Sequence, residues 1–234
     1  IRLLGEYRPD ATLVTDLWQE GRRLWLSGEF TPDKTLQVLW ADNGYADFGG
    51  WPEDMKGSPF GIYLHAGVWH NQVVQDPYPG LIGKALGEAA ARGMYHNALV
   101  NGQSFKPFIL NLEAAAHALW NPETFNPDEF YLEWAGRYFG KDAAAETVAA
   151  MKLLHRAHKP VNGYRDVTKT SQKIIRNLSQ GKPEPADADA VKESLEPASR
   201  ATKLAGATKS RIPADSIEVY NDQVLYPMTL FVRN

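Results

Sequence analysis

The sequence predicts an α/β part over residues 1–121, the C-terminal part of a (β/α)8 barrel, followed by an antiparallel helical bundle over residues 122–234. In the first part short β-type runs alternate with helical stretches, which is typical of βαβ units and a parallel sheet. From Asn126 onward the apolar residues recur with the spacing of helices. Three predicted strands cannot close a barrel, because a barrel of eight needs about 250 residues. We therefore expect the missing strands, and half of the active site, to precede Ile1, and this segment alone to be inactive.

Composition excludes several classes of protein. Of the 234 residues 44% are hydrophobic and 23% are charged, with a formal net charge of −3. No basic field favours nucleic acid or an anionic membrane as a partner. No apolar stretch reaches the roughly 20 residues that span a bilayer. The absence of cysteine excludes disulfides, thiolate metal sites and a cysteine nucleophile.

Three compact apolar runs predict strands, and a polar residue stands at the end of each. The runs are Leu36–Ala41, Phe60–His65 and Asn97–Asn101. The polar residues are Asp42, His65 and Asn101. In a (β/α) barrel the carboxyl ends of the strands form the active face, so we expect these side chains to share it. The alternative is that strands end on polar residues because they end at the surface.

Helical periodicity predicts the other elements. In the first part they are Thr12–Gly28, Pro79–Arg92 and Leu110–Leu119. In the second part they are the helix begun by Asn126, Pro127 and Glu129 as N-cap, N1 and N3, then Ala143–Ala157, Val167–Leu178, Val191–Leu204 and Pro213–Val232, with a polar linker at Lys182–Asp187. The charges of the second part are scattered as on a solvated face, which indicates little catalytic content.

His155 and His158 have a spacing that could bind a metal ion. No third ligand is evident in the sequence, so we expect a surface pair and no metal.

Aromatic residues are abundant, with seven Trp and ten Tyr, and several share a stretch with Asn, Asp or His. Flat rings beside hydrogen-bonding groups suit sugars, whose apolar faces stack while their hydroxyls form directional bonds. The alternative is that most of these rings belong to the core.

Short motifs occur in order along most of the chain. They are Leu17-Trp18-Gln19-Glu20, Gly28, Pro32-Asp33, Leu39-Trp40-Ala41-Asp42-Asn43, Phe60–His65 with Trp69, Val100-Asn101 with Lys106-Pro107, and Gln223-Val224-Leu225-Tyr226-Pro227. Together they resemble glycoside hydrolase family 115.

The resemblance implies an inverting α-glucuronidase that removes glucuronic acid, often 4-O-methylated, α-1,2-linked to xylose in the plant polysaccharide glucuronoxylan. It also implies an N-terminal domain, a complete barrel, further C-terminal modules that allow a homodimer, and a secreted or periplasmic location. We expect no metal and no organic cofactor, since such hydrolysis needs only acid–base groups.

The same resemblance assigns site residues. Glu20 and Asp42 fall on catalytic positions, and the substrate-binding positions are Asn43, His65, Trp69, Asn101 and Lys106. Inverting hydrolysis needs one carboxylic acid and one carboxylate, roughly 6.5–9.5 Å apart, and a uronate ligand also needs a cation, for which Lys106 is the candidate.

Several of these residues also have explanations that involve no catalytic or binding role. Glu20 could be an exposed helix residue, and Asp42 could form an Asx-turn before Gly44. His65 could be a hydrogen-bonded core histidine, and Lys106 a surface lysine.

The chain departs from the family pattern at several of these motifs. Asn43 and Gly44 replace an Asp and an Asn, Gly49-Gly50 replaces an Arg pair, and Gln103-Ser104 replaces Gly-Asp. The Arg pair and the Asp are groups that suit an anionic sugar and acid–base chemistry. The alternative function is therefore a glycan-binding protein without turnover, or a hydrolase of another glycan. A purely structural role would follow if Glu20, Asp42 and His65 did not share a cavity.

Overall fold

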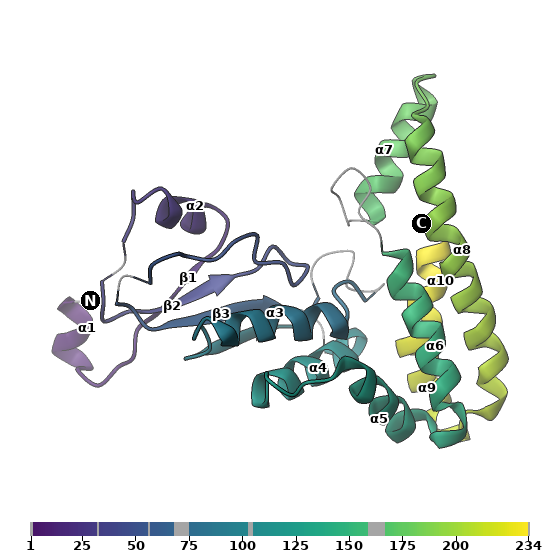
Figure 1. Cartoon of the computed structure of the whole chain (residues 1–234), viewed down its shortest axis with the longest axis horizontal. Coiled ribbons are helices and arrows are strands. Elements are labelled where there is room, and N and C mark those ends of the chain that lie inside the picture. Colours follow the sequence, from purple (N-terminus) through teal and green to yellow (C-terminus); the bar gives the residue numbers. More distant parts are fainter. Residues whose placement is uncertain are drawn as a thin grey trace.

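Four short strands form a parallel sheet. The computed structural model describes residues 2–31, 33–55, 57–67, 75–102, 105–158 and 167–233. The strands are β1 (Val14–Leu17), β2 (Gln37–Ala41), β3 (Phe60–His65) and β4 (Ala98–Asn101). They lie in chain order, each parallel to its neighbour (Figure 1). The carboxyl ends of all four strands therefore lie at one edge of the sheet.

The first strand corrects the sequence prediction, which had one helix over Thr12–Gly28. The structure has β1 there, followed by the helix α2 (Glu20–Leu26). Gln19 separates the two elements with φ 44°, a backbone conformation that does not continue either of them. Apolar residues that fit one helical face in fact serve two elements, with Leu17 buried in the strand and Trp25 in the helix.

The remaining predicted elements are present. They are α3 (Pro79–Ala91), the 3-10 turn η2 (Lys106–Phe108), α4 (Ile109–Trp120), α5 (Pro127–Phe139), α6 (Lys141–Ala157), α7 (Val167–Ser179) and α8 (Pro185–Thr208). After α8 the chain forms the 3-10 turns η3 (Lys209–Arg211) and η4 (Ala214–Ser216), α9 (Ile217–Tyr220), a π-helical turn η5 (Asn221–Leu225) and α10 (Tyr226–Arg233). At the other end of the chain, a short helix α1 (Arg2–Tyr7) precedes β1. Asn126 caps α5 as predicted, since its side chain accepts hydrogen bonds from two backbone N–H groups. The predicted linker at Lys182–Asp187 is shorter than expected, because α8 begins inside it.

One face of the sheet forms a core with the helices. Successive strand residues point to opposite faces, so Trp40, Phe60 and Ile62 lie on the same face. This face packs against Trp25 of α2 and Ile82 of α3. The ring of Trp25 contacts that of Phe60 edge-on, with centroids 5.2 Å apart. The opposite face presents Tyr63, His65 and Asn101, so polar groups gather on this face.

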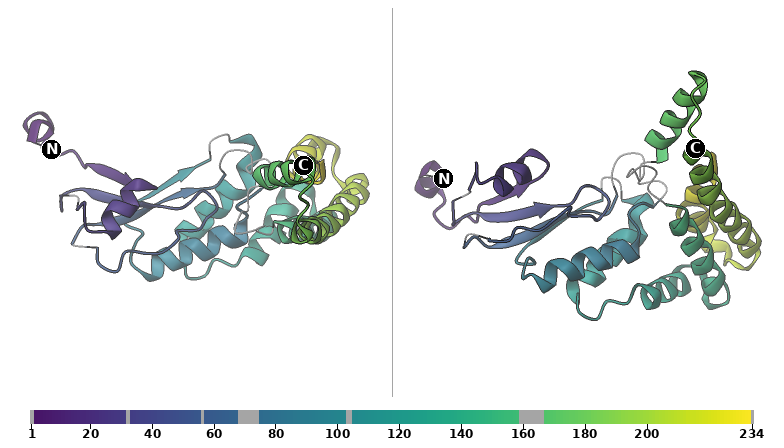
Figure 2. Two further views of the ribbon diagram at one scale, coloured as in Figure 1. Left: turned by 90° about the horizontal axis from the view of Figure 1, so that it is seen from above. Right: turned by 45° about the horizontal axis from the view of Figure 1, so that its top comes forward.

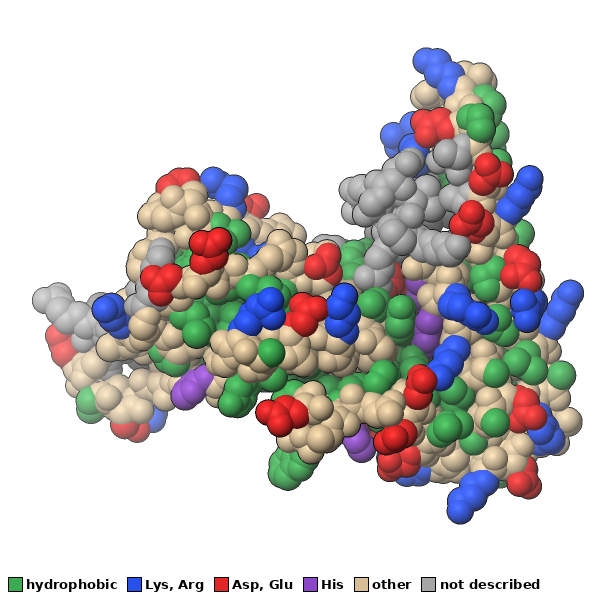
Figure 3. Space-filling model, viewed as in Figure 1, with side chains coloured by type: hydrophobic (Ala, Val, Ile, Leu, Met, Phe, Trp, Pro, Cys, Tyr) green, Lys and Arg blue, Asp and Glu red, His purple; other side chains and the backbone are tan. Residues whose placement is uncertain are grey.

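A second hydrophobic core lies among the helices α5, α6, α8, α9 and α10, with contributions from α4. Trp134 and Phe139 of α5, Met151 of α6 and Tyr220 of α9 are among its buried residues. Figure 2 shows these helices at the end of the molecule opposite α1, and Figure 3 shows acidic and basic side chains interspersed over their visible face. The predicted domain boundary at 121–122 falls in the turn between α4 and α5. Side chains of α4 lie in both cores, so the two parts of the chain are packed through this helix.

His155 and His158 do not form the surface pair that we expected. Their exposed fractions are only 6% and 8%. The Nδ1 of His155 lies 2.8 Å from the Tyr131 hydroxyl, and its ring stacks on Tyr78 at 4.6 Å. The pair is buried because α6 packs against α5, while Tyr78 stacks on His155 and Phe231 of α10 contacts His158. Within the described ranges no group of three or more His, Asp or Glu side chains is placed to hold a metal ion. Nor does any described helix have the length and apolar character that a bilayer crossing requires.

Candidate active site

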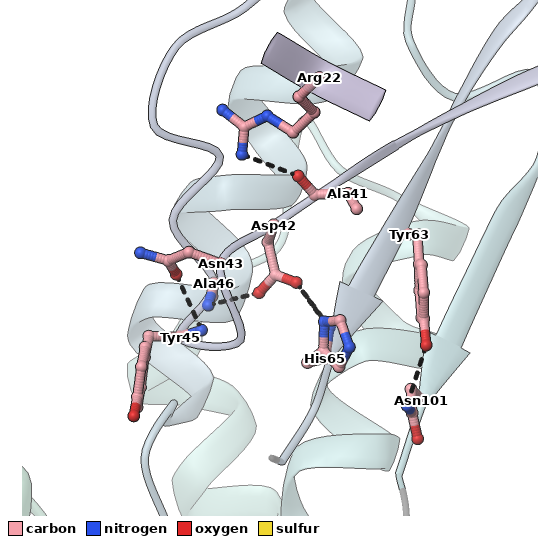
Figure 4. Close-up of polar contacts among 9 residues, drawn as sticks. All are labelled: Arg22, Ala41, Asp42, Asn43, Tyr45, Ala46, Tyr63, His65 and Asn101. Atoms are coloured by element: carbon pink, nitrogen blue, oxygen red, sulfur yellow. Dashed lines mark hydrogen bonds and ion pairs between the residues drawn. The ribbon is translucent and has the colours of Figure 1, made fainter. Parts of the chain in front are cut away.

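A buried carboxylate and an imidazole meet at the carboxyl edge of the sheet. Asp42 follows β2 and is 0% exposed, and His65 ends β3 and is 2% exposed. One carboxylate oxygen, Oδ1, lies 2.5 Å from His65 Nδ1 and also accepts the His65 backbone N–H at 3.2 Å. The other, Oδ2, accepts the backbone N–H of Ala46 at 2.8 Å (Figure 4). Since a carboxylate accepts hydrogen bonds, this contact places a hydrogen on Nδ1 and leaves Nε2 for another partner.

The neighbouring strands add further side chains to this pair. Tyr63 of β3 stacks on the His65 ring at 4.5 Å, and its hydroxyl accepts a hydrogen bond from the Asn101 amide at 3.0 Å. Trp18, directly after β1, lies 5.6 Å from the His65 ring. Residues at the ends of all four strands thus form one cluster, which confirms that Asp42, His65 and Asn101 are brought to one edge.

An open cleft of about 600 Å³ lies beside Asp42. It is lined by Trp18, Gln19, Arg22, Arg23, Leu26, Ser27, Asp42 and Asn43. The lining combines an aromatic ring with amide, hydroxyl and guanidinium groups, which is the combination that binds sugars.

Arg22 is a member of this cleft that the sequence analysis did not identify. Its half-buried guanidinium donates hydrogen bonds to the carbonyls of Ala41, at 3.1 Å, and of Phe48. It also lies over the Trp40 ring, 5.0 Å from the centroid. Burial lowers the pKa of Arg22, whereas the negative charges of nearby Asp47 and Asp42 raise it. The sequence offered only a local signal, a basic residue two positions after Glu20. Its environment depends on a loop that begins twenty residues further along the sequence.

That loop, residues 42–50, is held by side chains of both Asp42 and Asn43, and the Asx-turn within it belongs to Asn43. The Asn43 side-chain oxygen accepts the Tyr45 backbone N–H at 3.0 Å, which is the Asx-turn that we had considered for Asp42. Further along, Gly49 and Gly50 have φ values of 58° and 119°, a region that strongly favours glycine. A β-carbon at position 49 would lie 3.2 Å from Arg22 Nη2. The two glycines therefore suit both this turn and the position of the guanidinium.

The other predicted site residues lie in different surroundings. Glu20 is exposed at the first position of α2, next to Gln19 of the cleft lining. Among the described residues, no polar partner of the Glu20 carboxylate is found. Trp69 lies outside the described residues, as do the substituted positions Gln103 and Ser104.

Lys106 is not brought to this cluster. Its exposed ammonium lies 2.7 Å from Asp222 and 3.4 Å from Glu218, two residues of the C-terminal helices. The hydrogen bond to Asp222, followed by that to Glu218, raises the pKa of Lys106. An ammonium paired in this way serves the contact between the two parts of the chain, so it is a poor candidate for the cation that binds a uronate.

The late motif beginning at Gln223 has a structural role at the same contact. Gln223 is 1% exposed and its side-chain amide donates to the backbone carbonyl of Lys106. Its own backbone carbonyl accepts a hydrogen bond from the Gln75 side chain at 2.6 Å. The motif therefore connects η5 to the segments that follow β3 and β4.

Comparison with known protein families identifies the family of this chain. The model of glycosyl hydrolase family 115 matches residues 4–161, which include the whole sheet and its cleft. The chain belongs to glycoside hydrolase family 115. No curated protein matches it in sequence.

A solved structure supports the fold. It is described as a family GH115 4-O-methyl-α-glucuronidase with specificity for decorated arabinogalactans, and the match has a TM-score of 0.71 at 16% identity. The alignment covers 99% of this chain and 32% of that protein, so the chain spans about a third of its length. At this identity the match shows a shared mixed α/β fold, with a parallel four-stranded sheet and many helices.

Proposed function

We propose that this chain supplies part of the catalytic centre of a glycoside hydrolase that removes glucuronic acid, or its 4-O-methyl form, from a plant polysaccharide. The substrate class is glucuronoxylan or a decorated arabinogalactan. The observation that carries the proposal is the buried Asp42–His65 pair beside an open cleft at the carboxyl edge of a parallel sheet. Membership of family 115 supports the hydrolytic reaction. A polymer of this kind is degraded outside the cytoplasm, so the proposed location is secreted or periplasmic.

The proposal includes a complete (β/α)8 barrel, of which these strands form the second half, and an antiparallel bundle after it. Sequential parallel strands with helices packed on one face and polar side chains at the carboxyl ends are the arrangement of such barrels. Among the described strands, β1 and β4 lie at the two edges of the sheet. Val14 on β1 and Leu99 on β4 are each 47% exposed. Further strands paired with these edges would cover both side chains and close the sheet.

Within this centre the residues have different tasks. Glu20 has an exposed carboxylate next to the cleft, and we assign to it one of the two acid–base roles of inverting hydrolysis. Both oxygens of Asp42 already bind groups of the chain, so its role is to position His65. His65 Nε2 then binds a sugar hydroxyl. Asn43 and Asn101 offer amide groups to the same sugar.

A substitution at Glu20 tests this function. In the full-length protein Glu20→Gln should lower the release of glucuronic acid from glucuronoxylan or arabinogalactan by about 100-fold or more, because it removes general acid–base catalysis. Binding of the glycan should remain. Glu29→Gln is the matched control, since Glu29 is an exposed carboxylate that contacts Ser27 and Arg23.

Two outcomes would change the proposal. Activity of the Glu20→Gln variant close to that of the unsubstituted protein would remove Glu20 from catalysis. If the full-length protein bound these glycans and released no uronic acid, the alternative of glycan binding without turnover would replace hydrolysis. The glycines at positions 49 and 50, where the family pattern has an Arg pair, are the observation that favours this alternative.

A further inference from the structure

Two arginines line the cleft, and they differ in their exposure and in their contacts. Arg23 has a side chain that is 66% exposed, and its guanidinium lies 3.7 Å from Glu29. Arg22 is half-buried and is held by two backbone carbonyls and the Trp40 ring. We propose that Arg22 binds the carboxylate of an acidic sugar in this cleft and makes the site selective for uronic acids over neutral sugars. The inference deepens the proposed function and rests on it for the identity of the reaction.

The Arg22 guanidinium has donors left for a ligand. A guanidinium carries five N–H groups in a planar fork, and the carbonyls of Ala41 and Phe48 take two of them. A carboxylate can bind two of the remaining donors side by side, an arrangement that is stronger and more specific than a single hydrogen bond. Because the carbonyls and Trp40 already hold the group, little side-chain freedom is lost when a ligand binds.

The nearby acidic residues do not occupy this fork. Asp42 uses its oxygens on His65 and Ala46, and Asp47 accepts hydrogen bonds from the Gly49 N–H and the Asn43 amide. Within the described part of the chain, no carboxylate is hydrogen-bonded to Arg22. Its charge is thus partly removed from water and lacks a directly bonded counter-charge. A carboxylate ligand would supply that counter-charge.

The loop opposite Arg22 is compatible with this role. Gly49 and Gly50 place no side chain over the guanidinium, and a β-carbon at position 49 would approach Nη2 to 3.2 Å. These are the positions where the family pattern has two arginines. In this chain Arg22 of α2, instead of the loop, supplies the cation of the site. A uronate can therefore be recognised although the loop has no arginine at positions 49 and 50.

Binding of two matched small ligands tests the proposal. The probes are methyl α-D-glucuronoside and methyl α-D-glucoside, which differ at the carboxylate, titrated into the full-length protein by calorimetry. Arg22→Gln should weaken binding of the glucuronoside by about 10- to 100-fold, since it removes a charge-assisted pair. It should change binding of the neutral glucoside by less than about twofold. Arg22→Lys keeps the charge without the fork and should recover part of the loss.

The controls separate recognition from a purely structural role. Arg200→Gln, at an exposed arginine of α8 that is paired with Glu196, should change both affinities by less than about twofold. Equal losses for both ligands in Arg22→Gln would assign Arg22 to holding the loop and overturn the proposal. A selective loss in Arg200→Gln, or an unsubstituted protein that does not prefer the glucuronoside, would also overturn it. A protein that prefers the glucuronoside through Arg22 and hydrolyses no glycan would refute the proposed hydrolysis alone.

Discussion

Asp42 is a fully buried carboxylate with a donor at each oxygen, whereas the carboxylate of Glu20 is exposed. Its Oδ1 lies against His65, and its Oδ2 holds the turn through Ala46 N–H. A group bound on both sides cannot approach a substrate without breaking those contacts. It instead fixes the direction of the imidazole, as carboxylates behind histidines do in many active sites.

Substitution of Asp42 by Asn should therefore lower turnover by disturbing the contact with His65. An amide has only one accepting oxygen, so its NH₂ group would face either the His65 ring N–H or the Ala46 N–H, donor against donor. We expect kcat on the polysaccharide to fall by about 100-fold or more, with a loss of about 1–3 kcal/mol in the free energy of unfolding.

Activity assays and urea unfolding measure the two effects. Asp47→Asn is the matched control, because Asp47 lies in the same loop and is exposed. Equal turnover in the two variants would show that the Asp42–His65 contact has no part in catalysis.

Secondary structure was predicted best where the local pattern and the tertiary contacts agree. The run Phe60–His65 is β3 to the residue, and α3 differs by one residue at its end. By contrast, the stretch from Thr12 fitted a helical face, yet its first half pairs with β2 as a strand. Four residues are too short for a local pattern to outweigh pairing with a neighbouring strand.

Two helical glycines, Gly83 and Gly136, differ in the space around them. Substituting each by alanine therefore separates the effect of helix propensity on stability from the effect of packing. A β-carbon at Gly83 of α3 would lie 2.5 Å from the Phe125 ring, whereas one at Gly136 of α5 meets nothing within 4 Å. We expect Gly136→Ala to stabilise the protein by about 0.5–1 kcal/mol, because alanine favours a helix. Gly83→Ala should destabilise it by about 1–3 kcal/mol, since Phe125 must move.

Thermal or urea unfolding of both variants checks this pair. A stabilising Gly83→Ala would mean that Phe125 does not pack against α3 in solution.

At the scale of the whole molecule, the contact between the helical part and the sheet part contains a buried titratable group, His155. It faces Tyr131 of α5, Tyr78 before α3, and His158 and Lys152 of its own segment. Burial, and then the charges of His158 and Lys152, hold the pKa of His155 well below its usual value of 6.5. The folded protein therefore keeps this ring neutral.

Acidification should weaken the fold through this residue. Below pH 6.5 the unfolded chain binds a proton at His155 that the folded protein does not, so stability falls as pH falls, by up to about 1.4 kcal/mol per pH unit. Above pH 6.5 His155 is neutral in both the folded and the unfolded state, so it does not make the free energy of unfolding depend on pH.

Urea unfolding between pH 7.5 and 4.5 measures the effect. The His155→Gln variant, which has no imidazole there, should show a smaller loss between pH 6.5 and 5. Identical pH profiles for the two proteins would contradict a neutral buried His155.

The sequence by itself determined most strands and helices, the parallel sheet and the gathering of Asp42, His65 and Asn101 at one edge. These follow from local periodicity and from the rule that parallel strands end on the same side. Tertiary structure alone decided that Asp42 is hydrogen-bonded at both oxygens, that Lys106 pairs with Asp222, and that Arg22 is held in the cleft by backbone carbonyls. Each of these depends on which distant groups reach a given atom, and the chemistry of a charged side chain is set by those neighbours rather than by its place in a motif.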